Sequence, residues 1–191
     1  TKDNDKLQIS IKKAISICDA LDLKNMDYLT IDCKVVSLDT SRITVVYQGE
    51  YYVKQGAYPV QTFYTNTVDL NQVKSLGIND YSDAYTMAGY LMSDDVRFVS
   101  AEPESVSSLW DIPFVAAEPK LTSALWDYRS SQSIDYFTDL LNKADFPSKN
   151  EDTSIFPESF SYLSNSTLYF SIPVPHALGD YAIVAYPMDG K

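Results

Sequence analysis

Long apolar runs and glycine-rich loops are both missing from this sequence. No segment approaches the roughly 20 consecutive apolar residues that a membrane-spanning helix needs, and the opening TKDNDKLQ lacks the basic patch and apolar core of a signal peptide. We therefore expect a mature or trimmed chain that meets a membrane only through a tether outside it. The six glycines, none adjacent to another, exclude the usual phosphate-binding loops.

Histidine is nearly absent, which limits the chemistry that the sequence can support. His176 is the single histidine, so a Ser-His-Asp triad or a common zinc site would need it. It lies in IPVPHALGD, between prolines and a glycine, a context typical of a solvated turn. We predict no catalytic residue, no metal site and no cofactor. A carboxylate-dependent glycan hydrolase stays open as an alternative, because 26 acidic residues offer many pairs and the sequence selects none of them.

Only two cysteines are present, Cys18 and Cys33, and they form no CxxC motif. Helical spacing in IKKAISICDAL turns Cys18 towards a core, and alternation in YLTIDCKVV turns Cys33 inward. One interpretation is a disulfide that ties this helix to this strand in an oxidising compartment, which would contribute about 3 kcal/mol in the chain-entropy model. The other interpretation is a pair of separate buried thiols.

Basic residues are scarce in the middle of the chain. The net charge is −11, and residues 79–160 hold 15 acidic against five basic residues, whereas residues 1–78 hold nine of each. A field of this sign repels phosphate, so we expect no nucleic-acid partner and no attraction to an anionic membrane surface. It would attract a cationic protein. A merely soluble acidic surface is the plainer interpretation.

The hydrophobic pattern mixes helices and strands along a chain that is 45% hydrophobic and long enough for a proper core. It predicts a helix at 7–21 and then two strands, 29–38 and 43–54, which a DTSR turn joins into a hairpin. The remaining predictions are a strand at 58–70, a helix at 83–92 capped by Ser82, a strand at 96–100, a helix at 133–146 ended by Pro147, a polar loop at 146–159, and strands at 160–174 and 181–187. Regular βαβ alternation is missing, so the expected fold class is α+β, an antiparallel sheet packed against helices in a single domain at 1–191.

One segment of the sequence is repeated with a few differences. AEPESVSSLWD at 101–111 and AEPKLTSALWD at 117–127 are identical at seven of eleven positions. In the second copy, Pro119 suits the first position of a helix whose apolar residues recur at helical spacing. Two copies are too few for a solenoid, so we interpret the segment as a helical insertion around 101–127.

Each copy of this segment holds one of the two tryptophans and ends in aspartate. The candidate ligand-binding residues are therefore Trp110, Asp111, Trp126 and Asp127. Tryptophan is enriched at interface hot spots, and its ring face stacks on apolar surfaces such as those of sugar rings. Alternatively, the tryptophans anchor short helices to the core.

Two further stretches carry short motifs of a known family. VKQGAYPVQTFYTNTVDLNQVKSLGINDY contains a strand ending in Gly-Ala-x-Pro, an Asp-Leu pair and an aspartate that opens a helix: Gly56, Ala57, Pro59, Asp69, Leu70 and Asp80. NSTLYFSIPVPHALGDYAIVAYPM contains Leu-Gly-x-Tyr-Ala and a late proline: Leu178, Gly179, Tyr181, Ala182 and Pro187. Over most of residues 7–90 and 130–188 the chain resembles the RsiV-like extracellular domain family. It departs from the pattern at Tyr58, where histidine is common, at Val73, where a turn glycine is common, and at His176, where tyrosine is common.

The resemblance implies a bacterial protein that is extracellular or exposed at the cell surface. The family includes the sensor domain of lysozyme-sensing anti-sigma factors, accessory domains of peptidoglycan deacetylases, and many lipoproteins. On this basis we expect a non-catalytic, membrane-tethered domain of the cell envelope that binds a cationic protein such as lysozyme. A peptidoglycan-binding accessory module is the alternative.

Overall fold

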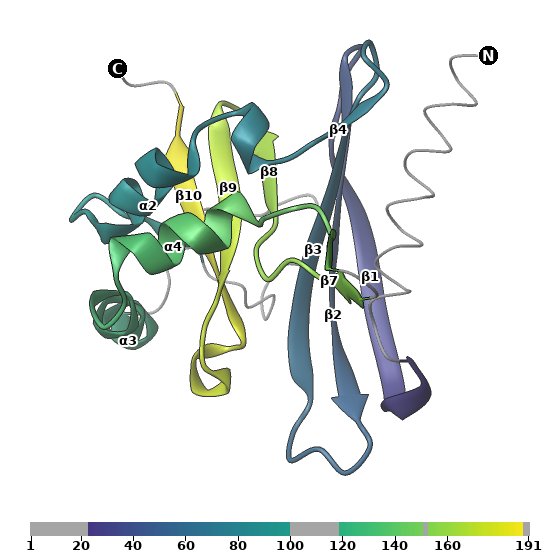
Figure 1. Ribbon diagram of the computed structural model, residues 1–191, viewed down its shortest axis with the longest axis vertical. Coiled ribbons are helices and arrows are strands. Elements are labelled where there is room, and N and C mark those ends of the chain that lie inside the picture. The colour runs from purple at the N-terminus through teal and green to yellow at the C-terminus, as the bar shows by residue number, and fades with distance from the viewer. Residues whose placement is uncertain (1–22, 100–118, 151–152, 189–191) are drawn as a thin grey trace.

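The computed structural model describes residues 23–99, 119–150 and 153–188 (Figure 1). This part of the chain forms two four-stranded antiparallel sheets, a two-stranded ribbon and three α-helices, so the predicted α+β fold class is confirmed. The strands form two sheets where one was expected. The predicted helix at 7–21 and the first copy of the doubled segment, 101–111, lie outside the described residues.

Sheet A has the strand order β1-β2-β3-β4. Its strands are β1 (Met26–Leu38), β2 (Arg42–Val53), β3 (Val60–Asp69) and β4 (Lys74–Leu76). The predicted hairpin is confirmed as β1 and β2, and the Asp39 carboxylate holds its turn by accepting hydrogen bonds from the backbone N–H groups of Ser41 at 2.7 Å and Arg42 at 2.8 Å. The sheet is one long hairpin widened by a third long strand.

Sheet B has the strand order β5-β10-β9-β8. Its strands are β5 (Phe98–Val99), β8 (Ser161–Ser164), β9 (Thr167–Pro173) and β10 (Tyr181–Pro187). Asn165 and Ser166 join β8 to β9 with positive φ angles of 47° and 56°, the backbone that a two-residue hairpin turn requires. Before β10, the short helix η3 (His176–Leu178) ends at Gly179, whose φ of 98° favours glycine.

Three helices pack on one side of sheet B (Figure 1). They are α2 (Ala84–Met92), α3 (Pro119–Ser130) and α4 (Ile134–Asn142), and two short 3₁₀ turns, η1 (Leu23–Asn25) and η2 (Ile78–Asp80), lie elsewhere along the chain. The apolar stripe of α4 buries Phe137, Leu140 and Leu141, as its helical spacing predicts. These side chains join Leu91 of α2 and Phe170 of β9 in the main hydrophobic core.

The two sheets meet through β3 and β8. The Thr65 hydroxyl donates to the carbonyl oxygen of Ser161 at 2.6 Å, and the rings of Phe63 and Tyr162 lie 6.4 Å apart between centroids. A second, smaller core surrounds this contact and includes Val46 of β2. Sheet A is therefore fixed to the rest of the molecule mainly along one of its three long strands.

The structure corrects several local predictions. The N-cap of α2 is Asp83, one residue after the predicted Ser82, because the Asp83 carboxylate accepts from Thr86 N. Helix α4 ends at Asn142, before Pro147. The predicted polar loop at 146–159 contains a small ribbon, β6 (Ser148–Asn150) paired with β7 (Thr153–Ile155).

The prediction that Cys33 faces inward is wrong. Cys33 is exposed on β1. Because β1 is the outermost strand of sheet A, the regular alternation of its side chains does not bury this position. Cys18 lies outside the described residues, so its pairing with Cys33 stays a prediction.

Candidate functional site

An acidic groove lies where the loop after α2 approaches the end of β10. Its volume of about 890 Å³ is within the range of about 300–1,000 Å³ that is usual for ligand sites. The chemically informative residues that line it are Asp83, Tyr90, Asp94, Asp95, Arg97 and Tyr186. One concave surface thus combines three aspartates with two tyrosines and one arginine.

Asp83 places a fixed negative charge at the start of α2. One carboxylate oxygen accepts the hydroxyl proton of Thr86 at 2.6 Å, and the other accepts Thr86 N–H at 2.8 Å. The hydrogen bond from the Thr86 hydroxyl, together with the backbone bond, holds the pKa of Asp83 below its ordinary value. Asp83 is therefore ionised at neutral pH, and its cap fixes where that charge sits.

Tyr90 forms a rigid aromatic wall. Its hydroxyl lies 2.9 Å from the carbonyl oxygen of Ala185 in β10 and 3.1 Å from that of Asp95, so it ties the loop to the sheet. Burial raises the pKa of Tyr90, which keeps the hydroxyl protonated as a donor. Its ring meets Tyr186 edge to face, with centroids 4.8 Å apart. The two rings therefore hold each other in place.

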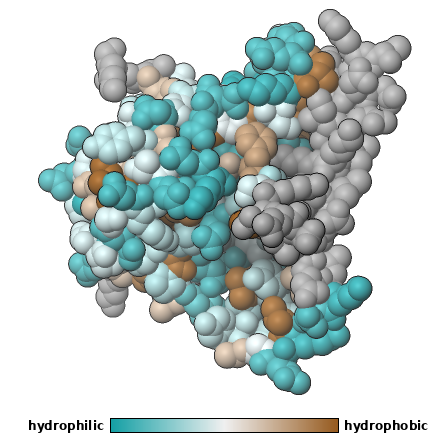
Figure 2. Space-filling view, viewed as in Figure 1, coloured by the Kyte–Doolittle hydropathy of each residue, from teal (hydrophilic) through white to brown (hydrophobic). Residues whose placement is uncertain are grey.

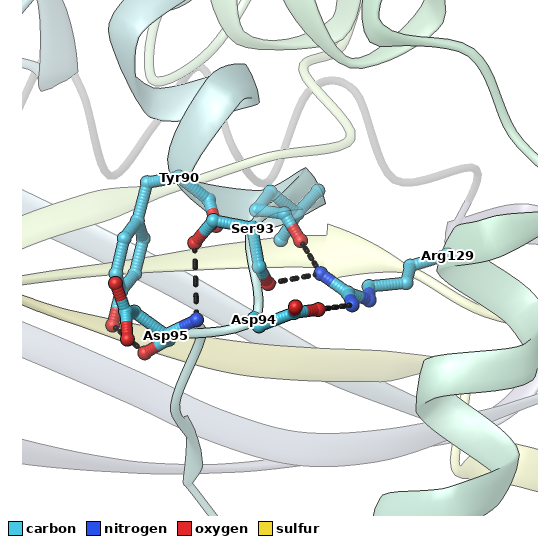
Figure 3. Close-up of polar contacts among 6 residues, drawn as sticks. Tyr90, Ser93, Asp94, Asp95 and Arg129 are labelled. Carbon is cyan, nitrogen blue, oxygen red and sulfur yellow. Dashed lines mark hydrogen bonds and ion pairs between the residues drawn. The ribbon is translucent and has the colours of Figure 1, made fainter.

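Arg129 of α3 fixes the loop from the other side (Figure 3). Its Nη1 donates to the carbonyl oxygen of Leu91 at 2.7 Å and to that of Ser93, both at the C-terminal end of α2. Those carbonyls have no partner within the helix, so a buried guanidinium is well placed to satisfy them. Burial lowers the pKa of Arg129 from its ordinary, very high value.

Asp94 lies on the solvent side of Arg129. Its Oδ1 is 3.7 Å from Nη2 of Arg129, but the Asp94 side chain is 98% exposed whereas that of Arg129 is 5% exposed. An ion pair with one partner in water contributes little stability. In Figure 3, Asp94 and Asp95 follow each other on the loop, and a 3.2 Å bond from Asp95 N to the Ser93 hydroxyl holds the turn. Asp94 thus presents its charge outward from a rigid support.

The sequence-predicted ligand residues lie outside this groove or outside the described chain. Trp126 is partly buried against the main core, and the Arg129 guanidinium carbon lies 4.0 Å from the centroid of its ring. Asp127 is exposed on the same helix. Trp110 and Asp111 fall outside the described residues. The binding role of all four stays a prediction, and the contact of Trp126 with Arg129 links it only indirectly to the groove.

The groove combines negative charge with aromatic surface. Its described lining offers carboxylates and tyrosines, but no histidine or cysteine. His176 lies at the other end of β10, in η3, and its Nδ1 is 3.0 Å from Asp180 Oδ1. In the part of the chain that the structure describes, no group of three or more His, Cys, Asp or Glu side chains is arranged to hold a metal ion.

Sequence reasoning missed the groove. The clusters NDYSDAY and MSDDVRF predict helix caps and solvated loops, and Asp83 and Asp94 fit that interpretation. The missing information was spatial: Tyr186 comes from the far end of the chain, and only the folding of β10 beside α2 brings it to the aspartates. No local pattern predicts such an encounter.

The described helices contain none with the length and apolar character needed to span a bilayer. The chain matches no protein-family model and no curated protein. The fold and the groove define the chain as a small α+β domain with an acidic groove lined by tyrosines. Its resemblance to the RsiV-like family rests on the residues quoted above.

Proposed function

We propose that this chain is a non-catalytic ligand-binding domain that captures a cationic protein, such as lysozyme, at the acidic groove. The observation that carries the proposal is the geometry of the groove. Exposed aspartates on a braced loop line the same groove as two tyrosine rings that pack edge to face. Aromatic side chains supply contact area at interfaces, and carboxylates steer a cationic partner towards it.

The charge of the whole chain supports the same partner. A net charge of −11, concentrated in residues 79–160, includes the groove aspartates. In the view of Figure 2 hydrophilic residues dominate the described surface, and hydrophobic residues appear only in small separate groups. A broad apolar interface is not apparent on this face, so electrostatic attraction is the stronger candidate for recognition.

Three positions support the resemblance to the RsiV-like family. Val73, at the place of the family's turn glycine, has a φ of 56°, a conformation that favours glycine and is costly for a β-branched residue. Tyr58 and His176 stand where the family commonly has histidine and tyrosine, and their rings stack with centroids 3.6 Å apart. Relative to the family pattern, tyrosine and histidine have exchanged positions in this chain, and their rings are in contact. Such a protein would belong to the bacterial cell envelope, held by a tether outside this chain.

Calorimetric titration with hen-type lysozyme tests the proposal. We expect saturable binding at low salt that weakens steeply between about 20 and 150 mM salt, because screening acts on exposed charges. The double variant Asp94→Asn/Asp95→Asn should weaken binding at least ~10-fold.

The matched control is Asp27→Asn/Asp32→Asn, which removes the same charge from exposed positions on β1. It should change the affinity much less. Equal losses in both double variants would show that net charge, and not the groove, attracts the partner. Absence of binding at low salt would overturn the proposal altogether.

A further inference from the structure

A second surface with a different chemistry lies at the opposite end of β10. Figure 1 shows the start of β1, the β2–β3 loop and the β9–β10 connection at one end of the molecule. Four aromatic rings gather here, those of Tyr28, Tyr52, Tyr58 and His176. We call these four residues, with Glu50 and Asp180 beside them, the tyrosine surface.

Tyr28 and Tyr52 form its first ring pair. They are opposite each other on β1 and β2, with ring centroids 6.0 Å apart and ring planes within 14° of parallel. The Tyr28 hydroxyl donates to Glu50 Oε1 at 2.9 Å, and the Tyr52 hydroxyl donates to the carbonyl oxygen of Gly56 at 2.6 Å. Because both hydroxyls are bound to the protein, the rings are held in place while Tyr28 stays 40% exposed.

Tyr58 and His176 form the second ring pair. Their planes are within 8° of parallel, and Tyr58 keeps 48% of its surface exposed even though His176 stacks on it. Nδ1 of His176 lies 3.0 Å and 3.1 Å from the two carboxylate oxygens of Asp180, which orients the imidazole. This pair bridges the β2–β3 loop of sheet A and the η3 turn of sheet B.

Gln61 joins the two ring pairs into one surface. Its side-chain nitrogen donates to Glu50 Oε2 at 2.9 Å, and its backbone N–H donates to Asp180 Oδ2 at 2.8 Å. The contacts therefore run without a break from Tyr28 through Glu50, Gln61 and Asp180 to the stacked rings. Single exposed tyrosines are common on proteins. Here hydrogen bonds connect the tyrosine pairs and fix their positions, so the surface is preorganised.

The chemistry of the tyrosine surface differs from that of the acidic groove. Both of its carboxylates already accept protein hydrogen bonds, and the Asp180 side chain is only 12% exposed. Tyr28 and Tyr58 are 40% and 48% exposed and present aromatic ring surface to solvent, with the carboxylates of Glu50 and Asp180 beside the ring pairs. Aromatic faces pack against the apolar C–H faces of pyranose rings, and carboxylates accept hydrogen bonds from hydroxyl groups. The same carboxylates repel phosphates and other anions.

We infer that the tyrosine surface is a binding site for a neutral oligosaccharide, which stacks pyranose rings on Tyr28 and Tyr58. The inference is independent of the proposed capture of a cationic protein, because the two surfaces share no residue and use different forces. Stacking and hydrogen bonds from uncharged sugar hydroxyl groups depend little on salt, because the ligand carries no charge, whereas the groove depends on attraction between opposite charges.

Titration with the β-1,4-linked tetramer of N-acetylglucosamine, with cellotetraose alongside, tests the inference. We expect saturable binding of the first sugar with a dissociation constant on the order of 1 mM or tighter, unchanged between about 20 and 150 mM salt. Tyr58→Ala should weaken it at least ~10-fold and Tyr28→Ala by a similar factor. Binding of cellotetraose with equal affinity would still support a pyranose site, without selectivity for the N-acetyl group.

The control variant is Tyr85→Ala, which removes a tyrosine that is 62% exposed on α2. It should bind the sugar as the unaltered chain does, and so should Asp94→Asn/Asp95→Asn. Tyr58→Trp keeps an aromatic face and should retain binding, which covers the case in which Tyr58→Ala does not fold. No saturable binding of either sugar, or the same loss in Tyr85→Ala as in Tyr58→Ala, would overturn the inference whatever the result with lysozyme.

Discussion

Sheet B with its helices and the β1–β2 hairpin of sheet A are built on different principles. In sheet B, Leu168, Phe170, Ile172 and Val184 have no exposed surface, and helices cover them. Strand β1 is longer than any strand of sheet B, with 13 residues, yet none of its side chains is buried. Hydrogen bonds to β2 and the partly buried Ile31 and Val36 hold β1, whereas fully buried hydrophobic side chains hold sheet B.

Because of this difference, we expect the region around sheet B to determine stability and the β1–β2 hairpin to serve recognition. Buried apolar surface is the main source of folding free energy, so the half of the molecule around sheet B should set its global stability. The β1–β2 hairpin contributes Tyr28, Tyr52 and Glu50 to the tyrosine surface. To hold these side chains together, its two strands need only keep their pairing register. The acidic groove, by contrast, lies on the rim of the stable half, where Arg129 and Tyr90 brace its loop.

The largest expected effect is the loss of a buried ring beside sheet B. Phe137→Ala removes a fully buried side chain of α4 and should lower the free energy of unfolding by about 3–5 kcal/mol. Leu38→Ala, at the 70% exposed end of β1, should change it by less than about 0.5 kcal/mol. Urea titration followed by circular dichroism measures both. Comparable losses of stability in the two variants would mean that β1 contributes to global stability as much as the core beside sheet B does.

A pair of glycine substitutions probes the two regions with the same chemical change. A Cβ on Gly49 would lie 1.9 Å from the backbone oxygen of Thr30 on β1, so Gly49→Ala must separate the hairpin strands and should cost about 1–3 kcal/mol. A Cβ on Gly89 in α2 meets nothing within 4 Å, so Gly89→Ala should add about 0.5–1 kcal/mol of stability. Hydrogen exchange should show faster opening confined to the hairpin in Gly49→Ala. Faster exchange in sheet B as well would mean that the two regions unfold together.

The local elements were predictable where a pattern of period two or 3.6 coincides with a turn signal. The β1–β2 hairpin follows from two β-rich runs around DTSR, and α4 follows from the spacing of Phe137, Leu140 and Leu141. The division into two sheets was not predictable, because it depends on Val99 pairing with Ile183, which lies 84 residues further along the chain. The ribbon of β6 and β7 was missed because its residues are polar and its strands are short.

The candidate sites were less accessible to sequence reasoning than the fold. The alternation around Cys33 is a real strand signal, but it cannot say that the strand is the outermost one of its sheet. The tyrosine surface joins Tyr28, Tyr58 and His176, which are scattered over the chain and carry no shared motif. The resemblance to the RsiV-like family marked Tyr58 and His176 as departures, and this was the one sequence signal that pointed to their contact.

A last, weaker test of the comparison concerns the one long strand of sheet A that is well buried. The Tyr64 ring in β3 meets Phe156 and Phe160 edge to face, at centroid distances of 5.4 Å and 5.2 Å. Burial raises the pKa of Tyr64 to about 12, against about 10 for a tyrosine in an unfolded chain. The raised pKa means that folding favours the neutral phenol. This contribution to stability is complete below pH 10 and is lost as the pH rises from 10 towards 12.

Tyr64→Phe removes the ionisable group and keeps the ring, so it isolates this effect. The free energy of unfolding of the unaltered chain should fall relative to the variant by about 1 kcal/mol between pH 8 and pH 11, from the linkage of a pKa difference of this size. Urea titrations at several pH values measure the difference, and Tyr85→Phe, which alters an exposed tyrosine, is the matched control. A pH-independent difference for Tyr64→Phe would mean that β3 opens to water as readily as β1. There would then be no difference in water exposure between β3 and β1, and all of sheet A would open as easily as the hairpin.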